Sequence, residues 1–387
     1  MKIAHVITRL IIGGAQENTI LTCEGLVERG HEVTLIAGPE TGPEGSLWPR
    51  AERRSGNLVQ VESLRRNIKP WCEIRAAGEL TRLFREGRFD VVHTHSSKAG
   101  ILGRHAAHRA GVPIIVHTIH GMSFNRTQGG FTQWLYRTLE RRAARYTDAI
   151  VCVADAMAAQ SVNAGVAPSD RFITIRSGME TDLYGPRPGD RANVRSEWGF
   201  RPDALVVGTV ARLFRNKGYE HLLEAMPQIV ADCPKVRFVW VGDGANRSEY
   251  EERLRKMRLR DHVHLTGLVP PAEIPRIMNG FDLLVHASMW EGLPRALVQA
   301  ALTGIPTVSF DNDGAPEAIA QGETGWLVPV GDTESLATRV AELCVDRESR
   351  IAMGQAAREH CLERFDHRLM VDQIDALYHR IAQQKGI

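Results

Sequence analysis

Short apolar runs alternate with amphipathic segments along most of the chain, and the alternation restarts near residue 204. The runs predict strands at 2–8, 32–38, 90–95, 113–120, 148–154 and 171–178, and then at 204–212, 236–244, 263–267, 282–288, 305–310 and 325–329. Apolar positions at helical spacing predict helices at 15–29, 98–110, 131–146, 217–232, 247–259, 293–303 and 332–346, and a mainly helical tail over 347–385. Strand–helix alternation is typical of the α/β class, in which parallel sheets carry helices on both faces.

The chain of 387 residues is longer than a single hydrophobic core usually supports, so we expect two domains. The stretch GPRPGDRANVRSEWGFRPD interrupts the alternation with three prolines and three glycines. We therefore predict a Rossmann-like domain over residues 1–185, a linker over 186–203, a second Rossmann-like domain over 204–365 and a terminal helix over 366–387. Residues 39–72, rich in Gly, Pro and Arg, are expected to form an irregular loop.

Composition narrows the class of protein. A hydrophobic content of 43% and a charged content of 24% are typical of soluble globular proteins, and no apolar run approaches the roughly 18 residues of a membrane span. The opening MKIAHVIT lacks the apolar core of a secretion signal, which favours the cytoplasm. A net charge of +2 argues against nucleic acid as a partner. Six scattered cysteines without a CxxC pair favour reduced thiols over a zinc site or disulfides.

Ligands of doubly wound sheets bind at the carboxyl ends of the strands, so the residues that follow each strand are the candidates for chemistry. Gly13 and Gly14 follow the first strand and precede a helix, where two glycines let the backbone approach a bulky anion. A GxGxxG dinucleotide fingerprint is absent. An ordinary strand-to-helix turn is the alternative interpretation.

Histidines gather at two predicted strand ends, His93 and His95 in VVHTH and His117 and His120 in VHTIHG. A His-x-His pair could supply two zinc ligands, but we expect strand alternation to place the two rings on opposite faces, and no adjacent carboxylate–His motif supports a metal. His120 is the best placed to meet a ligand, because Gly121 follows it at the end of a strand. A structural or solvent-facing histidine is the alternative.

Arg212 and Lys217 follow the first strand of the second predicted domain, at the start of a helix. The helix dipole disfavours cations there, so their placement is better explained if they share a bound diphosphate. Arg offers a planar fork and Lys a point charge, which suits phosphate charge spread over several oxygens. Two solvated charges are the alternative.

Residues 286–317 combine two glycine-containing loops with a helix and a strand. Glu291 precedes Gly292, Leu293 and Pro294, and we place Pro294 in the first turn of the following helix. A carboxylate beside helix-opening amides can hold a polyhydroxylated ligand and its phosphate. The alternative is a solvated carboxylate in an ordinary loop.

Arginines also recur at helical spacing in the segment 126–145, at Arg137, Arg141 and Arg145, among apolar neighbours such as Trp134. A basic amphipathic helix of this kind can lie on an anionic membrane surface. The alternative is a solvated face.

The order of these motifs resembles the retaining glycosyltransferases of family 4 (glycosyl transferases group 1). The similarity rests on GG after the first strand, HG after a later strand of the first half, R-x4-K at the start of the second half, and EGLP followed by GIPTV. It covers essentially the whole chain and is more specific in the C-terminal half. It implies a GT-B fold, in which two doubly wound domains face each other across a cleft and the last helix crosses back to the first domain.

The resemblance implies a retaining, metal-independent glycosyltransferase of the hexosyltransferase type, without a cofactor. It would move a sugar from a nucleoside diphosphate sugar, UDP-linked, to an alcohol acceptor in cell-envelope polysaccharide, lipopolysaccharide or glycolipid synthesis, with peripheral contact to an anionic membrane at its inner face. The implied catalytic residues are His120, Arg212, Lys217 and Glu291. The implied donor-binding residues are Gly13, Gly14, Arg212, Lys217, Leu268, Val269, Glu291, Gly292, Leu293 and Gln299.

Two positions depart from the family pattern. Gln299 stands where the family usually has a second Glu, and it can still accept a hydrogen bond from a ribose hydroxyl although it carries no charge. The family's GGxE motif is Gly13-Gly14-Ala15-Gln16 in this chain. Two other classes of function stay open from sequence: a sugar-nucleotide epimerase and a non-catalytic sugar-nucleotide-binding protein.

Overall fold

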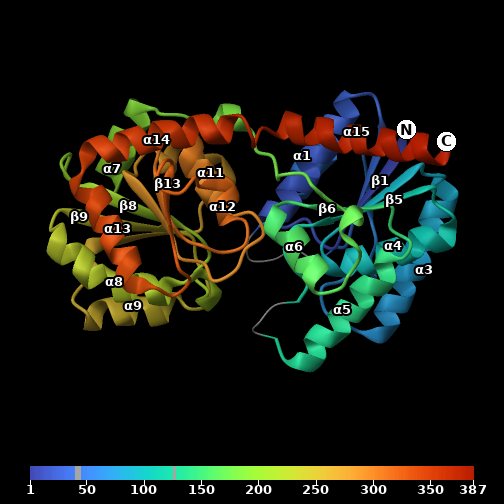
Figure 1. Cartoon of the computed structure of the whole chain (residues 1–387), viewed down its shortest axis with the longest axis horizontal. Coiled ribbons are helices and arrows are strands. Elements are labelled where there is room, and N and C mark those ends of the chain that lie inside the picture. Colours follow the sequence, from blue (N-terminus) through green and yellow to red (C-terminus); the bar gives the residue numbers. More distant parts are fainter. Residues whose placement is uncertain (40–44, 125–127) are drawn as a thin grey trace. The chain divides into compact units, whose positions relative to one another are not determined.

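The computed structural model describes residues 1–39, 45–124 and 128–387, and these form two compact units (Figure 1). The first unit comprises Met1–Met179 together with Asp366–Ile387, and the second comprises Glu180–Phe365. Each unit is built on one parallel sheet with helices on both faces, as the alternation of strands and helices predicts.

The sheet of the first unit has, among the described residues, seven parallel strands in the order β3-β2-β1-β4-β5-β6-β7. The strands are β1 (Lys2–Ile7), β2 (Glu32–Ala37), β3 (Asn57–Gln60), β4 (Val91–His95), β5 (Ile114–Ile119), β6 (Ala149–Cys152) and β7 (Phe172–Thr174). The helices are α1 (Gly14–Glu28), α2 (Trp48–Arg54), α3 (Pro70–Gly87), α4 (Ser97–Ala110), α5 (Gly130–Ala144), α6 (Asp155–Asn163) and α15 (His367–Lys385). The strand order reverses between β1 and β4, which is the switch point of a doubly wound sheet.

Alternate residues of these strands serve two separate cores. On β1, Ile3 and Ile7 pack with α1, α2 and α15, whereas Ala4 and Val6 pack with α3 and α4. The strands read as continuous apolar runs because both faces of the sheet are covered. Each strand therefore presents every second side chain to the same layer of helices.

The C-terminal helix α15 packs on the first unit beside α1 (Figure 1), as the GT-B resemblance predicts. Its buried residues recur at spacings of three and four, which gives one apolar face: Met370, Val371, Ile374, Leu377, Tyr378 and Ile381. The two helices approach closely at Gly25, because an added Cβ there would lie 2.7 Å from Cγ2 of Val371. Nearby, Arg29 forms an ion pair with Asp372, and Nε2 of His31 is hydrogen-bonded to Asp375 at 2.9 Å.

The sheet of the second unit has six parallel strands in the order β10-β9-β8-β11-β12-β13. They are β8 (Leu205–Val210), β9 (Val236–Val241), β10 (Val263–Gly267), β11 (Leu283–His286), β12 (Thr307–Phe310) and β13 (Gly325–Val328). The helices are α7 (Pro188–Glu197), α8 (Tyr219–Asp232), α9 (Arg247–Lys256), α10 (Ile274–Met278), α11 (Arg295–Leu302), α12 (Ala315–Ala318), α13 (Thr333–Val345) and α14 (Arg347–Leu362). Its switch point lies between β8 and β11.

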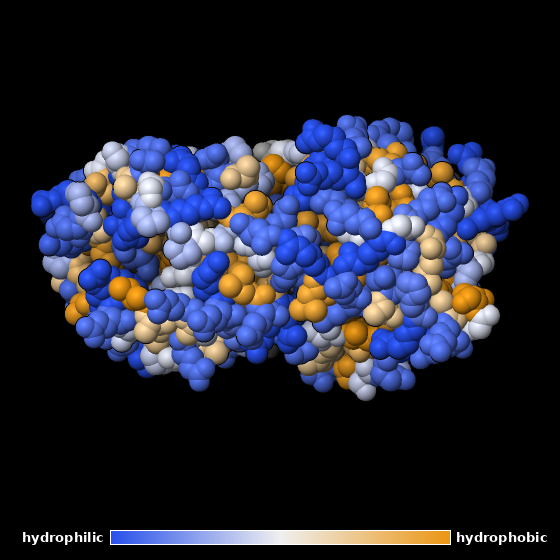
Figure 2. All heavy atoms as spheres, turned by 90° about the horizontal axis from the view of Figure 1, so that it is seen from above, coloured by the Kyte–Doolittle hydropathy of each residue, from blue (hydrophilic) through white to orange (hydrophobic). Residues whose placement is uncertain are grey.

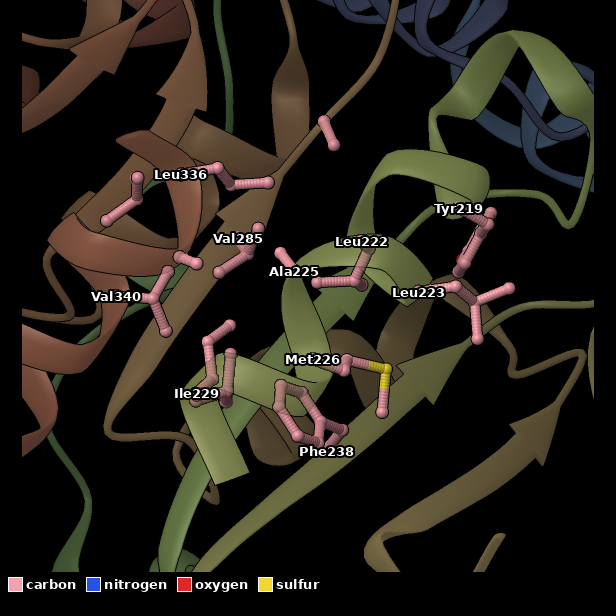
Figure 3. Packing of buried hydrophobic residues seen from close by; sticks show 14 of the residues in the cluster. Tyr219, Leu222, Leu223, Ala225, Met226, Ile229, Phe238, Val285, Leu336 and Val340 are labelled. Carbon is pink, nitrogen blue, oxygen red and sulfur yellow. The ribbon is translucent and has the colours of Figure 1, made fainter. Parts of the chain in front are cut away.

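The largest core of the second unit lies between this sheet and the helices α8 and α13 (Figure 3). Leu222, Met226 and Ile229 repeat along α8 at helical spacing and are fully buried or nearly so. They pack with Phe238 of β9 and Val285 of β11 in one cluster. This packing fixes α8 against β11, and so it fixes the two loops that end at Tyr219 and start after His286.

Two predicted segments differ from the structure. Residues 186–203, expected as a linker, contain α7 and belong to the second unit. Arg191 and Arg195 of α7 bind the carboxylate of Asp282 at 2.6 and 2.5 Å, an attachment that Pro and Gly content does not reveal. The stretch 39–72 contains α2 and the edge strand β3, while residues 40–44 of it lie outside the described residues.

The helical tail predicted over 347–385 divides into α14 and α15, because Asp366 accepts a hydrogen bond from the amide of Arg368 and caps the second helix. Among the described residues no helix is long and apolar enough to cross a bilayer. Figure 2 shows hydrophilic residues over most of the face that it presents, with hydrophobic residues in scattered groups. All six cysteines are unpaired.

Candidate active site

The switch point of the second unit brings two predicted site segments together. β8 and β11 are adjacent strands, paired at Leu283 with Val207 and at Leu284 with Gly208. The segment with Arg212 and Lys217 follows β8, and the segment with Glu291 follows β11. A crevice at the carboxyl ends of strands at a switch point is the usual ligand site of such sheets.

Lys217 and Glu291 form an ion pair at this point. The Lys217 ammonium donates a hydrogen bond to Glu291 Oε1, and Ser288 Oγ donates to the same oxygen at 2.9 Å. The side chains are only 13% and 19% exposed, so both charges are largely withdrawn from water. Such pairs contribute little to net stability because desolvation offsets their attraction, and a pair of this kind at a strand end is a candidate for function.

Burial acts to raise the pKa of the Glu291 carboxyl, but the positive charge of Lys217 and the nearby His286 outweigh it and hold the pKa well below its ordinary value. Nε2 of His286 lies 3.5 Å from Glu291 Oε1. Glu291 is therefore ionised throughout the neutral range. It offers hydroxyl groups a carboxylate that accepts hydrogen bonds only.

The loop after β12 holds the Glu291 segment from behind. Asp313 accepts a hydrogen bond from the amide of Glu291 at 2.7 Å, and the amide of Gly314 donates to the carbonyl of Gly292 at 3.0 Å. The Asn312 side-chain amide also donates to the carbonyl of Ser288. The loop after β12 thus positions the loop that carries Glu291.

Gly218 allows the Lys217 segment to lie against β11. Its φ of +72° is in the left-handed region, and an added Cβ would lie 1.7 Å from the carbonyl oxygen of Ala287. Lys217 ends the short 3-10 helix η3 (Arg215–Lys217) directly before this glycine. The close approach brings the lysine within reach of Glu291.

The other residues predicted for the donor site lie nearby in sequence but differ in exposure. Arg212 is exposed, and its guanidinium lies over the ring of Phe214, 5.0 Å from the centroid. Gly292 and Leu293 are buried and precede α11, which begins at Arg295, so Pro294 is the residue before the helix and not part of its first turn. Leu268, 57% exposed, and Val269 follow the edge strand β10.

Gln299 lies on α11 and donates a hydrogen bond from Nε2 to the hydroxyl of Tyr184 at 2.8 Å. The side-chain nitrogen of Gln299 therefore faces Tyr184. The amide oxygen is then the group that Gln299 can offer to a ligand hydroxyl.

The remaining predicted residues belong to the first unit. Gly13 precedes α1 with a φ of 176°, which is ordinary extended backbone, and Gly14 is the first residue of the helix. His120 follows β5 and lines a pocket of about 240 Å³ together with Ala15, Ser96, His117, Gly121 and Glu140. The first unit thus also has a hollow beside the carboxyl ends of its central strands.

His5, His93 and His95 lie together on the sheet face that α1 and α15 cover, and their ring nitrogens lie within 4.8 Å of one another. The His93 and His95 rings stack with centroids 4.5 Å apart, because residues two apart on a strand share a face, so the expectation that they would point to opposite sides is wrong. Both nitrogens of His93 are engaged, with Tyr378 at 2.5 Å and Thr118 at 2.6 Å. His95 is also hydrogen-bonded at both ring nitrogens, to His5 and His120, whereas Nε2 of His5 has no partner among the described residues.

Several supporting residues were not predicted as part of the site from sequence: His286, Ser288, Asn312, Asp313 and Tyr184. His286 and Ser288 lie two residues apart just before Glu291, so their place at the end of a strand was a usable signal. Tyr184 carries no local signal, because its contact with Gln299 spans 115 positions.

The fold and this switch-point site define a class of protein, and comparisons with known proteins specify it. The family described as glycosyl transferases group 1 matches residues 190–360, and the glycosyl transferase 4-like domain matches residues 13–178. The two matches together cover most of the chain. The chain therefore belongs to the group 1, family 4 glycosyltransferases and has the GT-B fold.

Two curated relatives illustrate the family. A UDP-Gal:alpha-D-GlcNAc-diphosphoundecaprenol alpha-1,3-galactosyltransferase of Escherichia coli is 28% identical over 381 residues, which is 98% of this chain and 96% of that protein. A GDP-mannose-dependent alpha-(1-6)-phosphatidylinositol monomannoside mannosyltransferase of Mycolicibacterium smegmatis is 27% identical over 351 residues, 89% of each chain.

Solved structures agree in fold. HepE of Anabaena in complex with UDP-glucose superposes with a TM-score of 0.84 at 22% identity, covering 98% of this chain and 100% of that one. WaaG, a glycosyltransferase involved in lipopolysaccharide biosynthesis, gives a TM-score of 0.78 at 17% identity, covering 97% and 99%. These likenesses concern the architecture.

Proposed function

We propose that the second unit binds a nucleoside diphosphate sugar, UDP-linked, and that the enzyme transfers the sugar to an alcohol acceptor with retention of anomeric configuration and without a metal. The observation that carries this proposal is the Lys217–Glu291 pair at the β8/β11 switch point, with Arg212 on the same loop as Lys217. The Glu291 carboxylate can accept hydrogen bonds from sugar hydroxyls, and Arg212 and Lys217 can bind the diphosphate.

Sugar transfer creates negative charge on the diphosphate, which Arg212 and Lys217 can stabilise. Transfer breaks the bond between the sugar C1 and the diphosphate oxygen and forms a bond from C1 to the acceptor oxygen, whose proton passes to the departing diphosphate oxygen. Negative charge grows on the leaving diphosphate, and Arg212 and Lys217 would stabilise it most strongly in the transition state. This is the role that a divalent cation has in other transferases. Lys217 would then exchange part of its contact with Glu291 for the phosphate.

In this proposal Glu291 binds hydroxyls of the donor sugar, and the amides of Gly292 and Leu293 lie by the sugar and phosphate at the start of α11. Gln299 receives a ribose hydroxyl on its amide oxygen. Leu268 and Val269 lie by the base. The first unit supplies His120 as a hydrogen-bonding group for the sugar and the loop at Gly13 and Gly14 for the diphosphate.

The acceptor class is proposed from the relatives. The E. coli relative acts on a diphosphoundecaprenol-linked sugar and the M. smegmatis relative on a phosphatidylinositol mannoside, by their names. We infer that this chain also extends a lipid-linked glycan in glycolipid, lipopolysaccharide or polysaccharide synthesis. The pocket beside His120 is the candidate place for the acceptor hydroxyl.

Binding and stereochemistry test the proposal separately. Titration calorimetry with UDP, GDP and their sugars should give binding to a uridine nucleotide that is tighter than to the guanosine one, without added metal and in the presence of EDTA. Proton NMR of the disaccharide made from an α-linked donor should show an α linkage. Absence of nucleotide binding would refute the donor site, whereas a β-linked product would refute retention alone.

A peripheral membrane contact is proposed for α5 in the first unit. Phe131 is 74% exposed and Trp134 is 59% exposed, beside the exposed Arg142 and Arg145. Arg141 has a structural role as well, because it binds the carbonyl of Gly165 at 2.7 Å. Residues 126 and 127 of the predicted basic segment lie outside the described residues.

Liposome sedimentation tests this contact. We expect recovery on vesicles that contain anionic lipid to fall in the double variant Phe131→Ser, Trp134→Ser, while the exposed Val345→Ser on the second unit has no effect. Equal recovery with and without anionic lipid would refute it.

Family membership favours transfer over the epimerase and binding-protein alternatives, and no contact of the site favours either of these.

A further inference from the structure

Two hydrogen bonds join three histidines in series: His5 of β1, His95 of β4, and His120, which directly follows β5. Nδ1 of His5 and Nε2 of His95 are 2.9 Å apart, and Nδ1 of His95 and Nε2 of His120 are 3.0 Å apart. The residues come from β1, β4 and the end of β5, which are neighbours in the sheet. His95 is therefore bonded at both ring nitrogens, one to each of the other histidines.

The position of His95 in this chain is tightly held. His5 is fully buried and His95 is 1% exposed. The His93 ring stacks on His95, and His93 is itself fixed by Tyr378 of α15 and by Thr118. The ring of His95 therefore has neighbours on its face and at both nitrogens, and it cannot turn without breaking the cluster.

Burial keeps the inner rings neutral. It lowers the pKa of His5 to about 3 and, together with the neighbouring histidines, holds the pKa of His95 well below its ordinary value. Each neutral ring has one N–H donor and one acceptor nitrogen. The two hydrogen bonds therefore run in the same direction along the chain, either from His5 toward His120 or back, and the tautomers of the three rings are coupled.

The outer ring nitrogen of His5 decides in which direction the two hydrogen bonds run. Nε2 of His5 is buried and has no hydrogen-bond partner among the residues that the structure describes. If the bonds ran from His120 inward, this nitrogen would carry an N–H without an acceptor, and orphaned buried donors are the rarer kind of unsatisfied group. If the bonds run outward from His5, the unsatisfied group is an acceptor nitrogen. The outward direction makes Nε2 of His120 an acceptor and leaves the proton of His120 on Nδ1.

We propose that His95, held by His5, is a positioning residue that fixes His120 in the tautomer protonated at Nδ1 and fixes the plane of its ring. In the transfer reaction His120 then presents its Nδ1 proton as a hydrogen-bond donor of defined direction. The significance for transfer rests on the proposed function of His120, whereas the tautomer itself is a property of the folded chain. At metal sites, outer partners that orient a ligating histidine change affinity or activity by about 10- to 100-fold when lost, and we expect a loss of the same order here.

Two amide substitutions at one position separate the two bonds of His95. In His95→Asn the amide lies near the place of Nδ1 and can still donate to His120, whereas in His95→Gln it lies near the place of Nε2 and reaches His5 instead. Both variants keep a polar group and lose the ring that stacks on His93. Tyr378→Phe is a matched control, because it removes one hydrogen bond from the same cluster without touching the chain to His120.

Nitrogen-15 NMR of histidine-labelled protein reads the tautomer of His120, whose signals are assigned as those lost in His120→Gln. We expect one tautomer, protonated at Nδ1, in the wild type, in His95→Asn and in Tyr378→Phe, and a mixture in His95→Gln. In turnover assays kcat should fall about 10- to 100-fold in His95→Gln with KM changed by less than about 2-fold, and His95→Asn should retain most of kcat.

A single Nδ1-protonated tautomer in His95→Gln, or a wild-type His120 protonated at Nε2, would overturn the inference. Equal losses of kcat in His95→Asn and His95→Gln would do the same, because a purely structural role does not distinguish the two amides. The NMR measurement needs no substrate. A wild type with the expected tautomer but without transferase activity would therefore contradict the proposed function and leave the inference standing.

Discussion

Lys217 and Glu291, 74 positions apart in sequence, form an ion pair where β8 and β11 end side by side. If either side chain turned away, the other would be left as a largely buried charge without its partner. The pair is thus the feature of the second unit that is least expected of a purely structural loop and best suited to a ligand that carries both hydroxyls and phosphates.

Loss of either partner of the Lys217–Glu291 pair should destabilise the folded chain. Lys217→Met and Glu291→Gln each leave one buried charge without its partner and should lower the free energy of unfolding, by up to about 3 kcal/mol. The double variant should be more stable than the sum of the two losses predicts, because no charge is then left unpaired. Denaturant titration of the four proteins measures this coupling. Strictly additive losses would show that the two side chains are not coupled in solution.

Stability should depend on pH through Glu291. Its pKa in the folded chain lies below the unfolded value of about 4.3, so its contribution to stability is present above that value and is lost as the pH falls through the folded pKa. The stability difference between wild type and Glu291→Gln should be constant from about pH 8 to pH 5 and shrink below about pH 4. Thermal melts across this range measure it. Glu52→Gln, at an exposed side chain of α2, is the control, and a difference that grows with acidity would contradict the assignment.

Gly218→Ala should damage the site more than the change of one methyl group implies. The new Cβ would meet the Ala287 carbonyl, and the φ of +72° disfavours any side chain. We expect a loss of about 1–3 kcal/mol in unfolding free energy and weaker nucleotide binding, because the Lys217 segment must move away from β11. Gly189→Ala, where an added Cβ meets nothing within 4 Å, is the matched control on the same unit. Wild-type affinity in Gly218→Ala would show that the close approach is unnecessary.

Gln299→Glu should tighten nucleotide binding. A carboxylate at this position would accept from both the Tyr184 hydroxyl and a ribose hydroxyl, and charge-assisted hydrogen bonds are roughly twice as strong as neutral ones. We expect several-fold tighter binding of UDP in Gln299→Glu and weaker binding in Gln299→Ala by calorimetry. Tyr184→Phe should have a smaller effect than Gln299→Ala. Unchanged affinity in all three variants would remove Gln299 from the ribose site.

Much of the fold followed from the sequence because its strands are continuous apolar runs between amphipathic helices. The exceptions have physical causes. Helix α7 was taken for a linker because Pro188 and Gly189 open it, although Arg195 then fixes it to Asp282. The edge strand β3 was missed because it has only two apolar residues, Leu58 and Val59, each half-buried, so it lacks the apolar run of a central strand.

The site was only partly predictable. The sequence alone identified Lys217 and Glu291, because each lies between a predicted strand and the helix that follows it. The residues that hold them in place depend on contacts distant in sequence, such as Asp313 on the amide of Glu291. The histidine cluster was misjudged for a different reason, since His93 and His95 were assigned to opposite faces of a strand that in fact presents both to the same side.

Sugar transfer by site variants tests the central claim most directly. Turnover is measured as nucleotide release that depends on acceptor, for wild type, Glu291→Ala, Lys217→Ala and the control Arg215→Ala, which alters an exposed pair on the same loop as Lys217. We predict that Glu291→Ala and Lys217→Ala each lose at least about 100-fold in kcat/KM, equivalent to about 2.7 kcal/mol of transition-state stabilisation, while Arg215→Ala stays within about 3-fold of wild type. Wild-type turnover in both Glu291→Ala and Lys217→Ala would contradict the assignment of this ion pair to the donor site.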